Sequence, residues 1–304
     1  MQRIYTQRAA LLALFTTDLP WPRRFRRGAT RRDEPGDTAL TGNWIPTPFL
    51  RFSAHLHALS AAVAAAQPEG LAYLAGLLAL DQLIVIGAGL HPRSRLIGAN
   101  LARLPAQAAS RGEVAITFDD GPDPGVTPRV LDLLDRYRVR ASFFCIARRA
   151  RQWPGLTREI VKRGHRVENH SYFHHAHRFG FHGVRRLSRE IGIAQQALER
   201  ITGQRPCYLR TPVGIRNLWL DAVLVPLGLK LVSWTRRGFD TASRDPRAIA
   251  ARLLKGIIPG DILLLHDGRY LHGARGNPIV LEVLPRLLDA IAERGLRPVA
   301  IDPP

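Results

Sequence analysis

From residue 113 onward, short apolar runs alternate with helix-length segments, and this alternation constrains the fold more than any other feature of the chain. The apolar runs have the length and composition of β-strands and occupy residues 114–118, 141–146, 165–168, 207–210, 230–234, 262–266 and 298–301. The segments between them have the length of helices, with Pro near several starts and Gly near several ends, and occupy 127–137, 156–163, 183–202, 218–227, 246–257 and 278–294. Strands that alternate with helices pair in parallel, so about seven such units predict a closed or nearly closed β/α barrel.

An open, doubly wound α/β sheet is the competing architecture. Such sheets commonly carry a glycine-rich phosphate-binding turn after the first strand. The chain contains neither GxGxxG nor GxxxxGK[ST]. The pattern therefore favours the barrel.

Composition allows a large core and limits the classes of partner. The chain has 304 residues, of which 46 % are hydrophobic, and a net charge of +19. The positive excess is spread along the chain, with 13 basic against 6 acidic residues in 1–112 and 31 against 19 in 113–304. Because this positive charge is not gathered in one segment, we expect no nucleic-acid partner.

The two cysteines, Cys145 and Cys207, are too few for a disulfide scaffold and lack the spacing of a zinc ribbon.

The part of the chain before residue 113 divides into three segments. Residues 1–51 are rich in Arg and predict a basic, disordered arm. Residues 1–15 imitate a signal peptide, but the apolar run is short and no small-residue cleavage site follows, which disfavours secretion by that route. A hydrophobic helical segment is expected at 52–92 and a linker at 93–112, followed by the β/α domain at 113–304.

The segment 52–92 contains 20 mostly apolar residues, Leu71 to Leu90, enough to cross a hydrocarbon layer of ~30 Å. Asp81 lies near their middle, and a central Asp costs roughly 2.5–3.5 kcal/mol on insertion. A membrane helix or re-entrant hairpin is favoured over a helix packed on the soluble domain, which indicates membrane association. Arg51 precedes the segment and Arg93 and Arg95 follow it, so the positive-inside rule assigns no orientation.

Polar residues follow the predicted strands, where β/α barrels place their catalytic groups. The first strand ends at Asp119 and Asp120, two adjacent carboxylates that repel each other unless a cation compensates them. His170 and His174 follow the third strand at a spacing that would stack both imidazoles on one face of a helical turn. Two imidazoles and one carboxylate make a three-ligand metal site with open positions for water. The alternatives are an Asp-Gly-Pro turn and a solvated His-rich loop.

Two further strand ends add charged groups. Arg210 ends the fourth strand and could hold a carboxylate in a two-pronged hydrogen bond, or form an ordinary structural ion pair. The penultimate strand ends at His266, which would place an imidazole at the barrel mouth unless it is only a polar cap. Trp234 ends the strand between them, and Asp240 follows six residues later.

These motifs together resemble a known family. Asp119-Asp120 within TFDDGP, His170-Ser171-x-x-His174, Arg210-x-Pro212 and Leu264-x-His266 occur in the order and spacing of the polysaccharide deacetylases, the NodB-homology domain of carbohydrate esterase family four. The resemblance covers residues 113–301, about two-thirds of the chain. It implies a distorted, TIM-related (β/α)7-type barrel and a metal-dependent hydrolase that removes N-acetyl groups from an amino-sugar glycan.

The resemblance also implies residue roles. It makes Asp120, His170 and His174 the ligands of a divalent metal, with zinc favoured and cobalt, nickel, iron or manganese as alternatives. Asp119 then resembles the catalytic base, Arg210 the residue that orients it and His266 the catalytic acid. The substrate-contacting set comprises Pro212, Trp234, Leu264 and Asp240.

Two departures leave the substrate open. Val213 stands where an aromatic residue is common, and the acidic residue behind Trp234 matches only loosely as Asp240. Basic residues near the mouth would favour an anionic or lipid-phosphate-linked sugar; they are Arg236, Arg237, Arg269 and Arg275. The alternatives are therefore a deacylase or deformylase of a lipid-linked amino sugar and a catalytically silent glycan-binding barrel.

Overall fold

The computed structural model of the chain describes residues 44–176, 178–274 and 276–303. Most of the expected N-terminal arm, residues 1–43, lies outside these ranges, as do His177 and Arg275. All elements below belong to the compact unit 44–304.

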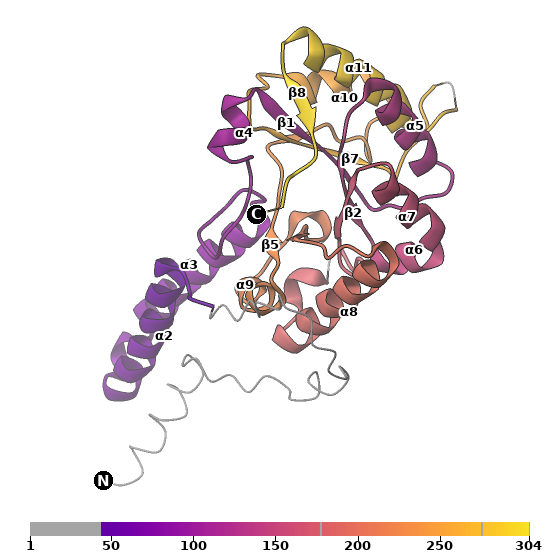
Figure 1. The fold of residues 1–304 in the computed structure, drawn as a ribbon. Coiled ribbons are helices and arrows are strands. Elements are labelled where there is room, and N and C mark those ends of the chain that lie inside the picture. The colour runs from indigo at the N-terminus through magenta and orange to yellow at the C-terminus, as the bar shows by residue number, and fades with distance from the viewer. Residues whose placement is uncertain (1–43, 177, 275, 304) are drawn as a thin grey trace. The chain divides into compact units, whose positions relative to one another are not determined.

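A parallel sheet forms the centre of the β/α domain (Figure 1). Its first strand, β1 (Glu113–Asp119), pairs with β2 (Ser142–Cys145) on one side and with β7 (Ile262–His266) on the other. The strand order is β5-β4-β3-β2-β1-β7-β6, and β8 (Arg297–Val299) pairs with the start of β1. The remaining strands are β3 (Arg166–Asn169), β4 (Tyr208–Leu209), β5 (Lys230–Leu231) and β6 (Arg236–Arg237).

The sheet curls because one stretch of chain, residues 230–237, bonds to both of its ends. The Val232 amide donates to the Leu209 carbonyl of β4 at 2.9 Å, and the Thr235 amide donates to the Ile262 carbonyl of β7 at 3.0 Å. The short strands β5 and β6 are thus two pieces of one distorted connection. This confirms the predicted α/β fold class of a distorted (β/α)7-type barrel.

Helices cover the outer face of the sheet. Each helix packs against the next in the order α10, α11, α5, α7, α8 and α9. Their bounds are α5 (Thr127–Tyr137), α7 (Pro154–Lys162), α8 (Val184–Thr202), α9 (Leu220–Leu224), α10 (Pro246–Leu254) and α11 (Ile279–Glu293). The short helix α6 (Ala147–Gln152) was not predicted, because its sequence ARRARQ carries no apolar stripe. Single turns of 3-10 helix lie at η3 (Phe179–Phe181), η4 (Pro212–Gly214) and η5 (Val225–Leu227).

Alternation along β1 decides which side chains enter the barrel. Val114, Ile116 and Phe118 pack outward with the helices, and Phe118 stacks on Phe143 at 4.9 Å. Because successive side chains of a strand point to opposite faces, the set 115, 117 and 119 points inward. Ala115 accordingly belongs to an inner apolar cluster. Thr117 and Asp119 therefore face the barrel interior near its carboxyl-terminal mouth.

The expected linker is part of the barrel rather than a free connection. It contains α4 (Ala106–Ser110), Leu101 forms a parallel bridge with Val232, and the Leu104 amide donates to the Gly260 carbonyl at 2.8 Å. Leu104 and Ala108 are buried in the inner apolar cluster. These apolar side chains bury against the strands, and that burial draws residues 101–110 onto the domain.

Before the barrel comes a helical hairpin of α2 (Pro48–Ala66), η2 (Pro68–Gly70) and α3 (Leu71–Leu90). The bounds of α3 are those expected from the sequence. Helix α2 begins earlier than residue 52, because Thr47 caps it by accepting from the Leu50 amide at 3.2 Å and Pro48 occupies the first turn. Residues 48–51 are therefore helical and do not belong to an arm.

Candidate active site

The site begins where β1 ends. Asp119 is the last residue of β1, and Asp120 takes a left-handed backbone with φ of 72°. Close packing surrounds this turn, since a Cβ at Gly268 would collide with the Asp120 carbonyl. The change of backbone region sends the two adjacent carboxylates to different partners, as the following contacts show.

Asp120 meets the two histidines that follow β3. Its Oδ1 lies 3.3 Å from Nε2 of His170 and 3.1 Å from Nε2 of His174. One candidate ligand atom from each of the three residues lies within 4.8 Å of the others. The structure thus brings together the carboxylate and both imidazoles that the sequence proposed as metal ligands.

These three residues fit a divalent metal ion. Oδ1 of Asp120 is buried and has no hydrogen-bond partner among the described residues. Nδ1 of His170 is engaged by the Arg210 carbonyl at 2.8 Å, which leaves Nε2 directed at the cluster, the usual arrangement of a metal-binding imidazole. Two imidazole nitrogens and a carboxylate oxygen are a donor set suited to zinc and related ions.

The histidine pair converges through a turn, not through the helical face expected from its spacing. Ser171 and His174 both have positive φ, 64° and 59°, which a right-handed helix excludes. The Ser171 hydroxyl accepts from the His174 amide at 3.1 Å and closes the turn. The two imidazole centroids end 4.8 Å apart. The same spacing therefore serves the site in a different backbone conformation.

The protonation states at the cluster suit metal binding. Burial, aided by the neighbouring His170, lowers the pKa of His174 to about 4, so this imidazole is neutral at pH 7. Burial by itself would raise the pKa of Asp120, but His170, His174 and His266 together hold it well below its usual range. Burial opposes the charged form of His170 as well, yet the carboxylates of Asp119 and Asp120 raise its pKa. A bound cation would add positive charge beside these carboxylates.

Arg210 holds Asp119 from the end of β4. Its Nη1 lies 2.7 Å from Oδ1 of Asp119 and donates to the Thr117 hydroxyl at 2.8 Å, while Nη2 donates to the Ser233 carbonyl at 3.1 Å. The guanidinium carbon sits 4.0 Å from the centroid of the Phe144 ring. The expected two-pronged pairing is not formed, because Thr117 and Ser233 take the other donor bonds. Oδ2 of Asp119 therefore stays clear of Arg210 and lies 3.9 Å from Nε2 of His170.

His266 is held by Asp240. Nδ1 of His266 lies 2.9 Å from Oδ1 of Asp240, and its backbone amide donates to Oδ2 at 2.8 Å. Burial opposes protonation of His266, but Asp240, with Asp119 and Asp120, raises its pKa. Asp240 is only 1 % exposed, and His266 occupies both of its oxygens. The Asp240 carboxylate thus orients His266, while the contact of Asp240 with a substrate stays a prediction.

The other residues predicted to contact the substrate lie around the mouth of the barrel and in its interior. Trp234 is nearly buried, and η4, which starts at Pro212, lies against its ring, since a Cβ at Gly214 would touch it. Val213 between them is half exposed, with φ of 51°. Leu264 is buried in the inner apolar cluster that includes Trp234. Leu264 therefore supports Trp234 from the barrel interior and does not line an open surface.

One buried residue of the site was not assigned from the sequence. Asp267 is fully buried, and its Oδ2 accepts from the Thr127 hydroxyl at 2.6 Å. Its Oδ1 has no partner in the described part of the chain, and burial, with the like charge of Asp120, raises its pKa to about 7. The only signal was its place directly after His266.

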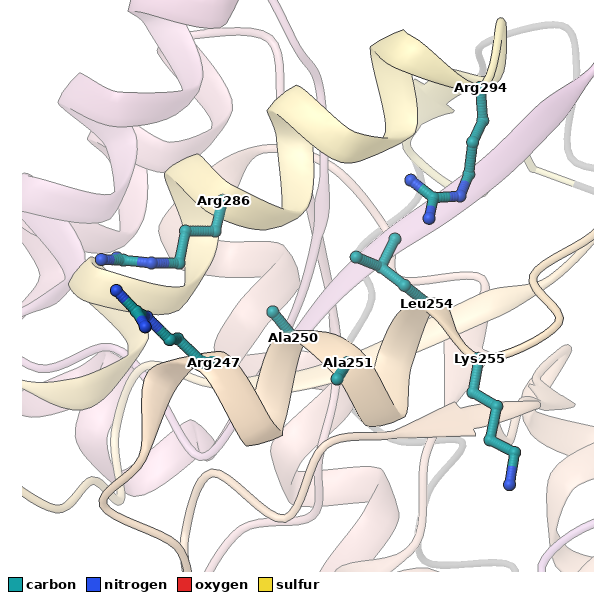
Figure 2. A pocket seen from close by; sticks show the side chains of 7 residues that line it. All are labelled: Arg247, Ala250, Ala251, Leu254, Lys255, Arg286 and Arg294. Atoms are coloured by element: carbon teal, nitrogen blue, oxygen red, sulfur yellow. The ribbon is translucent and has the colours of Figure 1, made fainter.

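A surface groove lies apart from this cluster, between α10 and α11, with a volume of about 660 Å³ (Figure 2). Its floor is apolar and its rim basic; its lining consists of Arg247, Ala250, Ala251, Leu254, Lys255, Arg286 and Arg294. None of the strand-end residues described above contributes to it.

The part of the chain that carries this site is similar to known proteins. A family model described as polysaccharide deacetylase matches residues 106–232. The chitooligosaccharide deacetylase of Sinorhizobium fredii is 36 % identical over 204 residues, 64 % of this chain and 93 % of that protein. A peptidoglycan-N-acetylglucosamine deacetylase of Bacillus cereus is 32 % identical over 191 residues, 62 % of this chain and 85 % of that one.

Solved structures agree with this match. The family 4 carbohydrate esterase from Streptomyces lividans, solved in complex with acetate, superposes with a TM-score of 0.57 and 32 % identity, covering 63 % of this chain and 94 % of that one. The motifs, the barrel and the similarity along nearly the full length of the Sinorhizobium enzyme thus agree. The chain belongs to the polysaccharide deacetylase family, the NodB-type domains of carbohydrate esterase family four.

Proposed function

We propose that this protein is a metal-dependent hydrolase that removes N-acetyl groups from an amino-sugar-containing glycan. The observation that carries the proposal is the meeting of three groups at the carboxyl ends of the strands. They are the Asp120–His170–His174 cluster, a carboxylate held by Arg210 and an imidazole held by Asp240. Relatives named as chitooligosaccharide and peptidoglycan-N-acetylglucosamine deacetylases support an N-acetylated glycan as the substrate class.

Asp120, His170 and His174 would hold the divalent ion, and their mixed nitrogen and oxygen donors favour zinc. When bound there, the ion polarises an amide carbonyl and lowers the pKa of a water ligand toward ~7. The contact between Nδ1 of His170 and the Arg210 carbonyl fixes the orientation of the ring, so that Nε2 is directed at the metal site. Cobalt, nickel, iron and manganese accept the same donors and are the alternatives.

Asp119 acts as the general base. Arg210 fixes Oδ1, so the carboxylate presents Oδ2 on the side of the metal cluster, 3.9 Å from Nε2 of His170. Asp119 can therefore take a proton from the attacking water without first reorienting.

His266 acts as the general acid. An amine leaves a tetrahedral intermediate readily only when its nitrogen is protonated. Asp240 binds Nδ1 of His266 and, with Asp119 and Asp120, raises its pKa, which favours the protonated ring that an acid requires. Nε2 of the same ring is then the donor toward the departing nitrogen.

An acyl or formyl group on a lipid-phosphate-linked amino sugar is the second candidate substrate. Arg237 supports it, because its guanidinium lies 5.8 Å from the Trp234 ring and 4.8 Å from the Phe239 ring, where it could contact an anion. Arg236 does not add to this charge, since it pairs with buried Asp261 at 2.8 Å and donates to the carbonyls of Lys255 and Gly256.

The test is acetate release from a panel of N-acetylated glycans, with formate release from formylated, phosphate-bearing glycolipids in parallel. Chelated protein and protein with zinc restored form matched arms, and metal content is measured in each. We expect release that disappears on chelation and returns with zinc. Glycan binding without any release would establish the silent barrel instead, and release that survives complete metal removal would refute the mechanism.

A further inference from the structure

Helices α2 and α3 form a hairpin (Figure 1). Many of its large apolar side chains are exposed. On α3, exposures of large side chains reach 65 % at Leu83 and 82 % at Tyr73, and only 17 % of its most apolar window is buried. Helix α2 adds Phe52 and Leu59, both more than 60 % exposed. A core helix of a soluble domain hides such residues, so this surface needs an apolar environment.

Polar groups lie on the opposite side, between the two helices. Asp81, in the middle of α3, is 4 % exposed and accepts from the Ser53 hydroxyl of α2 at 2.7 Å. Gln82, which is itself exposed, donates to the same carboxylate oxygen at 3.2 Å and lies 3.2 Å from Nε2 of His57. Ser60 is also buried. A polar interior with an apolar exterior is the arrangement that a lipid bilayer requires of a helix pair.

The lengths of the helices match a bilayer. Helix α3 has 20 residues and α2 has 19, which at 1.5 Å per residue gives each a length of ~30 Å. This is the thickness of a typical hydrocarbon core. The turn between them, Gln67 to Gly70, contains Glu69 and no basic residue.

The hairpin also settles where the flanking arginines lie. Arg51 is in the first turn of α2, while Arg93 and Arg95 follow the end of α3, so an antiparallel pair brings all three to one end. The Thr47 hydroxyl donates to the Leu96 carbonyl at 2.8 Å, which joins the two flanks directly. The arginines thus precede and follow the helix pair in sequence but lie at the same end of it in space. The positive-inside rule then assigns this end to the cytoplasm.

The same end is fastened to the barrel. The Arg216 amide donates to the Gly89 carbonyl at 3.1 Å, and the Arg216 guanidinium binds the Ser94 carbonyl. A Cβ at Gly89 would collide with the Arg216 carbonyl, so the approach requires glycine. The end of α3 therefore keeps the catalytic domain close to the basic end of the hairpin.

We propose that α2 and α3 span a lipid bilayer as a two-pass hairpin. The buried Ser53–Asp81 hydrogen bond joins its two helices, with Gln82 and His57 beside it, and the catalytic domain lies on the cytoplasmic side. The occupant of the apolar surface is bilayer hydrocarbon rather than a second copy of the chain. Two observations favour lipid: the apolar groups extend over most of the circumference of α3, and the basic end suits anionic headgroups.

Topology is tested by labelling one introduced cysteine at a time in the full chain, expressed in a bacterial host with Cys207→Ser as background. The native thiol that remains, Cys145, is buried, and the background protein without an introduced cysteine is the control for its labelling. Glu69→Cys reports the turn and Arg93→Cys the basic end. We expect a membrane-impermeant maleimide to label Glu69→Cys in intact spheroplasts and Arg93→Cys only in inverted vesicles. Labelling of both from the same side would overturn the two-pass arrangement, and the reverse pattern would overturn the orientation.

Partition provides the second measurement. The full chain should stay with membranes through high salt and carbonate washes, whereas Leu80→Arg/Leu83→Arg should raise the soluble fraction more than ~10-fold. Phe181→Arg, at an exposed apolar residue of the barrel, is the matched control and should stay with the membrane. A wild-type chain that is released by salt, or that purifies without detergent as a dimer through this face, would contradict lipid insertion.

Discussion

Arg210 and Asp119 form an ion pair with both partners buried, at 2.7 Å between Nη1 and Oδ1. The carbonyl of the same arginine engages Nδ1 of His170 at 2.8 Å. One residue at the end of β4 thus positions both the proposed base and a proposed metal ligand. The orientation of the proposed base and that of the proposed ligand therefore both depend on where Arg210 lies.

Arg210→Met should destabilise the fold by ~3–5 kcal/mol, because it leaves the Asp119 carboxylate buried without its partner. Denaturant unfolding at pH 7 measures the effect. The double variant Asp119→Asn/Arg210→Met removes both charges and should recover much of this stability while remaining inactive. Equal stability of the single and double variants would mean that the charge pair is not the cause.

Asp119→Asn and Asp120→Asn should fail in different ways. The first removes the proposed base and should lower kcat by ~10²–10⁴-fold while keeping about one metal ion per chain. The second removes a ligand and should lose the metal as well as the activity. Metal analysis beside initial rates makes the distinction, and loss of metal from Asp119→Asn would reverse the assignment of the two carboxylates.

Asp240→Asn should shift the alkaline limb of the kcat–pH profile to lower pH. Asp240 helps raise the pKa of His266, and the proposed acid must be protonated, so activity is lost as pH rises through that pKa. Without the Asp240 charge the loss begins at lower pH. Asp240→Glu is the conservative control and should restore part of the wild-type limb; an unchanged limb in Asp240→Asn would exclude His266 as the acid.

The His266–Asp240 pair should also contribute to stability in a defined pH window. A raised pKa in the folded state means that the contribution is fully present below the unfolded His value of ~6.5 and fades as pH rises through the folded value. The difference in unfolding free energy between wild type and Asp240→Asn should therefore be larger at pH 6 than at pH 9. A difference that grows with pH would contradict the raised pKa.

Replacing the buried carboxyl of Asp267 should raise the stability of the fold, whereas replacing Asp240 should lower it. Burial raises its pKa to about 7, so metal-free protein loses stability as pH rises from the ordinary Asp range through 7 and this carboxyl ionises without a partner. Asp267→Asn should remove that loss and be more stable than wild type at pH 8. Unfolding curves from pH 5 to 8 measure it, and parallel curves for the two proteins would refute the shifted pKa.

Local patterns in the sequence determined much of this molecule. Helices α3 and α5 have the bounds expected from apolar periodicity, and the strand-end motifs placed Asp119, Asp120, His170, His174, Arg210 and His266 at one edge of the sheet. These features are predictable because side-chain alternation and helix punctuation depend on neighbours a few residues apart. The assignment of catalytic and ligand roles within that set stays a prediction.

Tertiary structure alone decided the contacts between distant segments. Asp240 turns to His266, Arg210 divides its donors among three partners, and residues 101–110 join the barrel, none of which has a local signal. The hairpin is the clearest case, since Ser53 meets Asp81 and both arginine-bearing flanks share one end. Periodicity says which face of an element is apolar; where the chain returns is set by the free energy of packing those faces together, a property of the whole fold.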